Sequence, residues 1–382
     1  MSRTDPSREA AQDRGPGKVV WQPTDLLDRS PRSILVVMLS ALGDAVMVLP
    51  VLSALRRAFP EARISWVIQP GPAPLAEGHA GVDRVIPFQR VRGPRPGAVL
   101  RSAAALARTV REMRQVAAAE SSGTFDLLLD LQVYFKAGLI TLLAPARIKL
   151  GFDYPRTRDL NWLLTTHRIP PHPQRYAHVQ DQYFEFLHHL GVDPEPLEYG
   201  LTLRSEERES QLRFLEKLDG PLCALVLATS KPEKDWNAEG FAEVARELRG
   251  RFGMHPVLVG GRSPREEALA LEVARLAPGI VEDARADDLR KLLWLLEGAE
   301  LVISPDTGPL HMARALEVPV VGLFGATNPK RSGPYGKGTG LVVDGYSRFP
   351  GEEYGAEPEL RRDGMARITP EMVMEKVALA RV

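Results

Sequence analysis

The feature that most constrains the fold of this chain is an alternation between short apolar segments and stretches with helical periodicity. The first segment, ILVVML over residues 34–39, is apolar throughout, as in a parallel strand that is covered on both faces. Further strand-like segments lie at residues 64–68, 84–88, 125–131, 147–152, 222–228, 254–261, 279–283, 301–304 and 318–324. Strands that alternate with helices through short loops form open, mostly parallel sheets with helices on both faces. The pattern therefore predicts a doubly wound α/β architecture.

Length and a change in composition predict two domains. At 382 residues the chain is long for one domain, and 44% hydrophobic residues are enough for two cores. Residues 193–220 are polar and proline-rich, which is typical of a linker. We expect a disordered tail over residues 1–30, a first domain over 31–200 and a second over 201–382. The terminal helix, expected at 368–380, could pack back on the first domain.

Charge and cysteine content exclude some classes of protein. The 49 Lys+Arg residues balance 49 Asp+Glu residues, which argues against general nucleic-acid binding. The single cysteine, Cys223, lies in an apolar segment and suits a reducing compartment. No apolar segment approaches the ~20 residues that span a bilayer, and the N-terminal residues are too polar for a secretory signal. These features predict a cytoplasmic protein.

Residues 301–328 have the pattern of a strand, a tight turn, a helix and a second strand. In such a unit the turn brings the free N–H groups of the helix to the carboxyl edge of the sheet, where small anions bind. Asp306 and Thr307 are helix-capping types, Gly308 permits close approach to the backbone, and His311 falls in the first helical turn. The turn could hold a phosphate. A capped helix with a surface histidine explains this window equally well.

Two more strand ends carry polar side chains. Asp44 follows the first strand, and Thr229, Ser230 and Lys234 follow the strand at 222–228. Hydroxyls, a lysine and a helix N-terminus at adjacent strand ends suit a diphosphate. The opposed carboxylate of Asp44 could then act as a general base on a second substrate. The simpler alternatives are that Asp44 only caps its helix and that the lysine is solvated.

Other ligand motifs do not occur in the sequence. Residues 39–43 offer one glycine where a dinucleotide-binding G-x-G-x-x-G needs three, which disfavours a Rossmann dehydrogenase. Neither a Walker lysine motif nor an Asp-x-Asp pair follows a predicted strand. His188 and His189 are helix neighbours that point to different faces, so a histidine metal site is not expected.

Several segments, matching in order and at compatible spacing, resemble glycosyltransferase family 9, the ADP-heptose:lipopolysaccharide heptosyltransferases. They are ILVVMLSALGDAVMVLPVLSALRRAFPEARISWVI, DLLLDLQVYFKAGLI with the following RIKLGFD, Lys234-Asp235-Trp236, and SPDTGPLHMARALEVPVVGLFGATNPKRSGPYG. The resemblance covers about residues 33–380. It implies the GT-B fold, in which two Rossmann-like domains face each other across a cleft.

The resemblance also implies a role for each candidate residue. Asp44 matches the catalytic base, which removes a proton from the acceptor hydroxyl during inverting transfer. Lys234 matches a lysine at the donor phosphates, and Thr229 and Ser230 match the hydroxyl pair ahead of it. The D-[TS]-G-x-x-H motif at the donor diphosphate and sugar corresponds to Asp306, Thr307, Gly308 and His311. The expected donor is ADP-heptose, with no cofactor and no metal ion.

Departures from the family pattern bear on donor and acceptor choice. Arg262-Ser263-Pro264 stand where some heptosyltransferases have an acidic residue for the nucleotide ribose. Gln132-Val133 replace a frequent QG, and Gly364 replaces a frequent cysteine. The expected acceptor is a lipid A/Kdo-type glycan of the lipopolysaccharide inner core. Alternatives are another NDP-sugar donor, another glycan acceptor, or a nucleotide-sugar binding paralogue without turnover.

A run of arginines suggests contact with the acceptor or a membrane. On the predicted helix 98–119, the residues that share one side are Arg101, Arg108, Arg111 and Arg114, preceded by Arg90, Arg92 and Arg95. Leu106 and Val110 form a buried stripe on the opposite side. The face could be merely solvated. If instead it meets anionic lipid or the acceptor, as Lys136 could too, we expect peripheral attachment to the cytoplasmic face of the inner membrane, released by salt rather than detergent.

Overall fold

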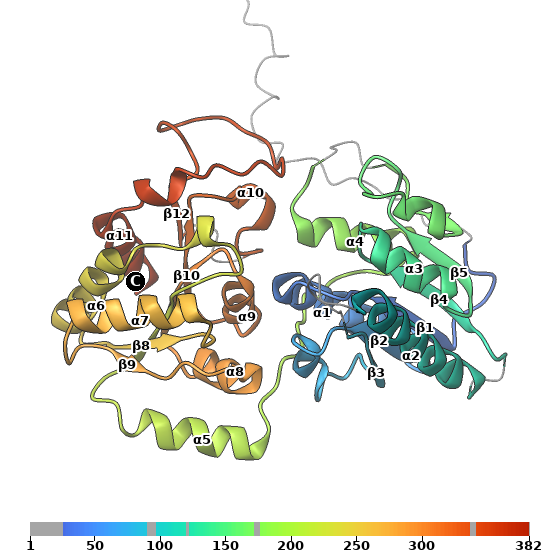
Figure 1. Cartoon of the computed structure of the whole chain (residues 1–382), viewed down its shortest axis with the longest axis horizontal. Helices are drawn as coiled ribbons and strands as arrows, with labels where there is room; N and C mark the ends of the chain where they lie inside the picture. Colours follow the sequence, from blue (N-terminus) through green and yellow to red (C-terminus); the bar gives the residue numbers. More distant parts are fainter. Residues whose placement is uncertain (1–25, 90–96, 120–121, 172–175, 337–340, 382) are drawn as a thin grey trace, which may run out of the picture.

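The computed structural model describes residues 26–89, 97–119, 122–171, 176–336 and 341–381. These residues form two six-stranded sheets, and each sheet has helices on both faces (Figure 1). The paired strands are parallel in both sheets, as their apolar sequences predict. The prediction of two doubly wound α/β domains that face each other is confirmed.

The first domain contains twelve elements in the described ranges. They are β1 (Ser33–Val37), α1 (Leu42–Ala58), β2 (Arg63–Ile68), η1 (Ala73–Ala76), β3 (Arg84–Pro87), α2 (Ala98–Ala118), β4 (Phe125–Asp130), α3 (Phe135–Leu143), β5 (Ala146–Gly151), η2 (Asn161–Leu164), β6 (His167–Arg168) and α4 (Val179–His189). The strand order is β3-β2-β1-β4-β5-β6. The order changes direction between β1 and β4, which leaves the loops after these two strands side by side.

The second domain repeats this topology. Its elements are α5 (Ser205–Leu215), β7 (Leu222–Val226), η3 (Pro232–Lys234), α6 (Ala238–Phe252), β8 (His255–Val259), α7 (Pro264–Leu276), β9 (Glu282–Asp283), α8 (Leu289–Glu297), β10 (Leu301–Pro305), α9 (Gly308–Ala315), β11 (Val320–Phe324), α10 (Pro329–Ser332), β12 (Val342–Asp344), η5 (Gly364–Arg367) and α11 (Pro370–Ala380). The strand order is β12-β11-β10-β7-β8-β9. The direction changes between β7 and β10.

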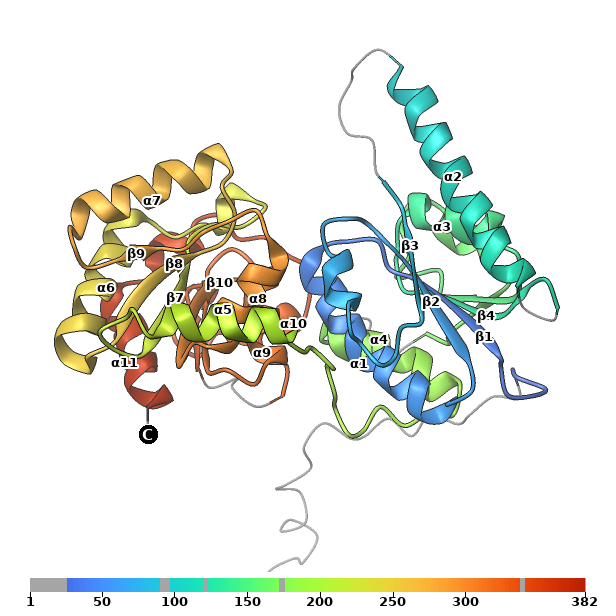
Figure 2. The same ribbon diagram turned by 90° about the horizontal axis from the view of Figure 1, so that it is seen from below.

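Alternating side chains bury both faces of each sheet. On β1, Ile34 and Val36 belong to the apolar layer under α1 and α4, whereas Leu35 and Val37 belong to the layer under α2 and α3. Figure 2 shows these two pairs of helices on opposite faces of the first sheet. In the second sheet, one face packs on α8 and α9 and the other on α6, α7 and α11.

The two domains meet where α1 packs against α9 (Figure 1). The apolar layers on this side join into one cluster that runs from α1 and α4 into α8 and α9. Two glycines permit the close approach. A Cβ on Gly43 would lie 2.8 Å from Cδ2 of His311, and a Cβ on Gly308 would lie 2.5 Å from Cδ2 of Leu42. The contact therefore brings the N-termini of α1 and α9 together.

The ends of the chain differ from the expectation. Residues 1–25 lie outside the described residues, but the last part of the expected tail contacts the first domain. Leu26 and Leu27 pack on its core, and Asp28 pairs with Arg147 at 2.9 Å. The expectation that the terminal helix could pack back on the first domain is wrong. Instead, α11 packs on α6, β11 and β12, because its apolar side chains complete the outer layer of the second domain.

The connection between the domains follows α4. The next helix, α5, already packs against α8 of the second domain. We therefore propose a boundary near residues 200 and 201, between α4 and α5. Within the described ranges, none of the helices combines the length and apolar character needed to cross a bilayer.

Candidate active site

A cleft of about 620 Å³ lies between the domains, and loops that follow β1, β4, β7, β10 and β11 form much of its wall. These loops stand at the carboxyl ends of the strands. The two direction changes, between β1 and β4 and between β7 and β10, both open into this space. Ligands of open α/β sheets bind at such places. Most candidate residues from the sequence therefore meet in one cavity.

Asp44 stands in the first turn of α1 and lines the cleft. Its Oδ2 accepts a hydrogen bond from the backbone N–H of Ala41 at 3.0 Å, and its Oδ1 accepts one from the Tyr183 hydroxyl at 3.1 Å. The carboxylate thus caps its helix and also faces the cavity. Burial raises the pKa of Asp44 above its ordinary value, although both hydrogen bonds and the nearby His311 and Arg331 oppose the rise. A carboxylate with a raised pKa is a better proton acceptor.

Across the cleft, Lys234 and Asp306 form a partly buried ion pair with Nζ 2.6 Å from Oδ2. The hydroxyl of Thr327 donates to the same carboxylate oxygen at 2.6 Å. Burial by itself would raise the pKa of Asp306, but His311 and the Lys234 charge outweigh it and hold the pKa well below its ordinary value. Since the His311 contact is 3.7 Å long, the ion pair with Lys234 is the firmer cause. Asp306 is thus a permanent anion that orients Lys234.

The hydroxyl pair after β7 divides into two roles. Ser230 is exposed and lines the cleft together with Lys231. Thr229 is buried, and its hydroxyl donates to the Lys231 carbonyl at 2.7 Å and accepts from the Lys231 N–H at 3.1 Å. The backbone N–H of Thr229 donates to Asp235 at 2.7 Å. Thr229 therefore shapes the loop that presents Ser230 and the two lysines.

The first turn of α9 forms the floor of the cleft. Thr307 is the N-cap residue, and Thr307, Gly308 and His311 all line the cavity. The first backbone N–H groups of a helix have no partners within it and carry a partial positive charge. His311 is buried rather than on the surface, because α9 packs against α1. This helix end and the neighbouring lysines can together bind a diphosphate.

Three further residues of the site were missed by the sequence analysis. Arg158, from the segment after β5, and Arg331, from α10, line the cleft, and the buried Tyr183 reaches Asp44 from α4. Arg331 falls in the segment NPKRSGPYG, which carried the family resemblance without a specific role. Helical periodicity shows that α4 has a buried face, but not that its tyrosine, Tyr183, meets a carboxylate of α1.

The predicted basic residues of α2 and α3 lie outside the cleft. Arg101, Arg108 and Arg111 are exposed on α2, and Lys136 is exposed in the first turn of α3. On the opposite side of α2, Val110 is buried as expected, and Leu106 is partly buried. Arg90, Arg92 and Arg95 lie outside the described residues.

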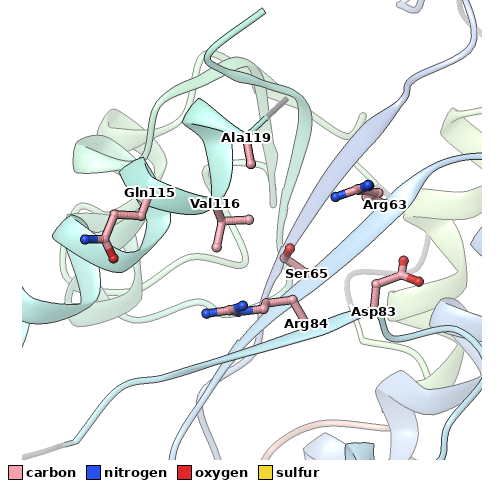
Figure 3. A pocket seen from close by; sticks show the side chains of 7 residues that line it. All are labelled: Arg63, Ser65, Asp83, Arg84, Gln115, Val116 and Ala119. Carbon is pink, nitrogen blue, oxygen red and sulfur yellow. The ribbon is translucent and has the colours of Figure 1, made fainter. Parts of the chain in front are cut away.

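A second pocket lies at the other edge of the first sheet. Figure 3 shows it between the start of β2, the start of β3 and the end of α2, with Arg63, Arg84 and Asp83 around it. These are the amino ends of the strands, opposite to the edge where ligands of such sheets bind. Asp83 already accepts hydrogen bonds from Arg56 and from the Ile64 backbone. The interdomain cleft is therefore the better candidate.

Cations line the interdomain cleft on both sides. Lys231 and Lys234 come from the second domain near η3, Arg331 from α10, and Arg158 from the first domain. In the part of the chain that the structure describes, His, Cys, Asp and Glu side chains do not gather in threes or more as a metal ion would require. The cationic side chains are groups that can neutralise a leaving diphosphate.

Comparison with known proteins identifies the family. The model of glycosyltransferase family 9 (heptosyltransferase) matches residues 113–354. The lipopolysaccharide core heptosyltransferase OpsX of Haemophilus influenzae is 26% identical over 333 residues, which cover 86% of this chain and 89% of that protein. Lipopolysaccharide heptosyltransferase 1 of Salmonella typhimurium is 30% identical over 308 residues, which cover 80% of this chain and 92% of that protein.

Solved structures agree. A family 9 glycosyltransferase of Veillonella parvula shares the fold with a TM-score of 0.74 at 24% identity, covering 91% of this chain and 97% of that one. The E. coli heptosyltransferase WaaC with ADP has a TM-score of 0.67 at 27% identity, covering 91% and 99%. WaaC with ADP-2-deoxy-2-fluoro heptose has a TM-score of 0.65 at 26% identity, with the same coverage.

Fold and cleft define a glycosyltransferase of the GT-B type. The chain belongs to glycosyltransferase family 9, which confirms the resemblance seen in its sequence.

Proposed function

We propose that this glycosyltransferase moves L-glycero-D-manno-heptose from ADP-heptose to the inner core of lipopolysaccharide. The observation that carries the proposal is the placement of Asp44 opposite Lys234 and the first turn of α9 in one cleft. The names of the OpsX and heptosyltransferase 1 relatives support the donor and acceptor classes. The WaaC structures with ADP and with a fluorinated ADP-heptose support an ADP-sugar donor.

The donor is proposed to lie on the second domain. Its diphosphate would contact Lys234, the hydroxyl of Ser230 and the backbone of Thr307 and Gly308, with His311 near the sugar. Two further residues hold these donor-contacting groups in position without contacting the donor themselves. Asp306 holds Lys234 through the 2.6 Å ion pair, and Thr229 supports the loop through its hydrogen bonds to Lys231.

The proposed chemistry is a single displacement. The Asp44 carboxylate removes the proton from the acceptor hydroxyl, and the hydroxyl oxygen attacks the anomeric carbon of the heptose. The bond between this carbon and the diphosphate breaks, so that ADP leaves and the configuration inverts. Lys234 and the N–H groups of α9 stabilise the charge that develops on the diphosphate, which is the task that a metal ion performs in other enzymes. We therefore propose a reaction that needs neither a metal ion nor another cofactor.

The acceptor is proposed to be a lipid A/Kdo-type glycan held by the first domain. Arg158 lines the cleft on this side, near Tyr134. A cation here suits a glycan with acidic groups. Lys136 and the arginine face of α2 belong to the same domain. We propose that they support peripheral attachment to the cytoplasmic face of the inner membrane.

The function can be tested with purified protein, ADP-heptose and a panel of truncated lipopolysaccharide acceptors. We expect one ADP released per heptose transferred, with the product identified by mass spectrometry. ADP should raise the melting temperature through binding to the folded state, whereas NAD should not. If heptose is not transferred from ADP-heptose but another NDP-sugar is used, the proposed donor is wrong. Stabilisation by ADP without transfer from any donor would indicate a binding paralogue without turnover.

A further inference from the structure

Large apolar side chains are exposed together on one side of the first domain. Leu142 on α3 is 47% exposed, and in the segment after β5 Leu160 is 59% and Leu163 52% exposed. Phe135, Leu143 and Tyr154 are also exposed in these two segments. We call the six residues the α3–η2 surface. Contiguous apolar side chains on a surface commonly mark an interaction site.

Contacts show that the two segments form one surface. Helix α3 packs on η2, so closely that a Cβ on Gly138 would lie 2.3 Å from Oδ1 of Asn161. Beside them, Lys149 on β5 donates to the Leu142 carbonyl at 2.7 Å. The ring of Tyr154 meets the ring of Trp162 edge to face at 5.2 Å.

The backbone holds one apolar residue of this surface in an unfavourable conformation. Leu160 has a φ of 61°, and Asp159 before it has a φ of 53°. A leucine rarely adopts the left-handed region, where its Cβ approaches the backbone too closely. Since Leu160 is more than half exposed, burial in the core does not explain the apolar residue at this strained position. Strained residues of this kind are concentrated at functional sites.

The charges around the α3–η2 surface are mostly positive. Between residues 134 and 168 the basic residues are Lys136, Arg147, Lys149, Arg156, Arg158 and Arg168, and the acidic residues are Asp153 and Asp159. Asp153 and Arg156 are paired with each other and their side chains are buried, and Arg147 is paired with Asp28. The basic border therefore consists of Lys136, Lys149, Arg158 and Arg168, against the acidic Asp159. An apolar centre with a basic border is complementary to an anionic lipid bilayer, where apolar side chains enter the interface and cations meet the headgroups.

The surface continues into the active-site cleft. Tyr134 directly precedes α3 and lines the cleft, and it is 48% exposed. Arg158 also lines the cleft, lies over the Tyr134 ring at 5.8 Å, and stands two residues before Leu160. An acceptor glycan attached to a lipid could therefore extend from a bilayer on this surface to Asp44.

We propose that the enzyme rests on anionic lipid through the α3–η2 surface, with the acceptor side of its cleft beside the membrane. The proposal rests on the proposed function, because a lipid-linked acceptor gives the contact its purpose. A second copy of the chain fits less well, since two basic borders would repel each other. The contact has an apolar part that salt does not remove, in addition to the salt-sensitive part expected from the arginines of α2.

The test compares two triple variants of the full chain. One carries Leu142→Gln, Leu160→Gln and Leu163→Gln. The matched control carries the same change at Leu212, Leu271 and Leu379, which are 52%, 64% and 55% exposed on the second domain. Binding is measured by co-sedimentation with vesicles of equal parts phosphatidylglycerol and phosphatidylcholine, at low and at high salt. We expect the α3–η2 variant to bind about tenfold more weakly at both salt concentrations, and the control to bind as wild type.

Kinetics provide a second readout. The α3–η2 variant should have a raised KM for acceptor embedded in vesicles, and an unchanged KM for a deacylated, water-soluble acceptor. Unchanged stabilisation by ADP verifies folding, and the single change Leu163→Gln replaces the triple variant if that one does not fold. Wild-type vesicle binding by the variant, equal loss in the control, or a change only in oligomeric state would each overturn the proposal. The vesicle assay needs neither donor nor acceptor, so a failure of the proposed function would be seen separately.

Discussion

At the scale of single residues, Asp44 occupies a position that suits both roles that the sequence presented as alternatives, helix cap and proposed general base. It caps α1 through Ala41 and also lies in the cleft beside Tyr183. Asp44→Asn keeps a capping side chain but cannot accept a proton. We expect kcat to fall by about 10²- to 10⁴-fold, the usual contribution of a positioned base, with unchanged ADP affinity. Steady-state transfer assays and ADP thermal shifts measure both; near wild-type turnover would leave Asp44 as a cap only.

The pH dependence provides the control for this assignment. Because burial raises the pKa of Asp44, kcat/KM should fall on acidification at a higher pH than for an exposed aspartate. The Tyr183 hydroxyl stabilises the charged carboxylate, so Tyr183→Phe should raise the pKa further and move the acid limb to higher pH. A pH–rate profile of both proteins checks the direction. If the acid limb of the profile lies at the same pH in Tyr183→Phe as in wild type, Tyr183 does not influence the group that titrates.

Lys234 offers a test of donor binding without a metal ion. A charge-assisted contact to phosphate contributes about 1.5–3 kcal/mol. Lys234→Ala should therefore weaken ADP binding by about 10- to 150-fold, as measured by calorimetry. The change also leaves buried Asp306 without its cation, so melting temperature must be recorded beside affinity. EDTA should leave turnover intact, and recovery by Mg²⁺ after loss in EDTA would contradict the metal-free proposal.

At the scale of elements, the long periodic segments were predicted well and the short turns less well. The helix expected over residues 98–119 is α2, Ala98–Ala118. By contrast, the pattern of residues 301–328 predicts a turn from Pro305 to Pro309 and a helix from Leu310, whereas α9 begins at Gly308. Proline is favoured in the first turn of a helix because it lacks an N–H that would be unpaired there, and Pro309 therefore belongs to the helix. Local patterns thus identify elements but not how each one starts.

The arginine face of α2 is an element-scale prediction. Arg101, Arg108 and Arg111 are exposed and lie outside the cleft, so they should affect the membrane and acceptor rather than the donor. Replacing all three with Gln should weaken binding to anionic vesicles at low salt, by about 1 kcal/mol for each residue near the surface. The KM for a membrane acceptor should rise, while ADP affinity stays unchanged. If the triple variant sediments with vesicles and turns over acceptor as wild type does, the arginine face of α2 is only solvated surface.

At the scale of the whole molecule, the site depends on contacts that no single segment contains. The strand ends that carry Asp44, Lys234 and Asp306 could be predicted, because apolar runs mark where strands stop. That His311 is buried, and that Tyr183 reaches Asp44, follows from the packing of α1 on α9 and α4. The α3–η2 surface was equally hidden, because a leucine in sequence does not reveal whether it is covered.

The apolar cluster shared by α1, α4, α8 and α9 also bears on rate. In the proposed reaction, it joins the half of the cleft for the acceptor to the half for the donor during folding, before either substrate binds. Two reactants held at a set separation behave as if each were present at a very high effective molarity. If that reaction takes place as proposed, part of its rate enhancement comes from this hydrophobic interface between the domains. A substitution that separates α1 from α9 would lower the effective molarity of one bound substrate at the other.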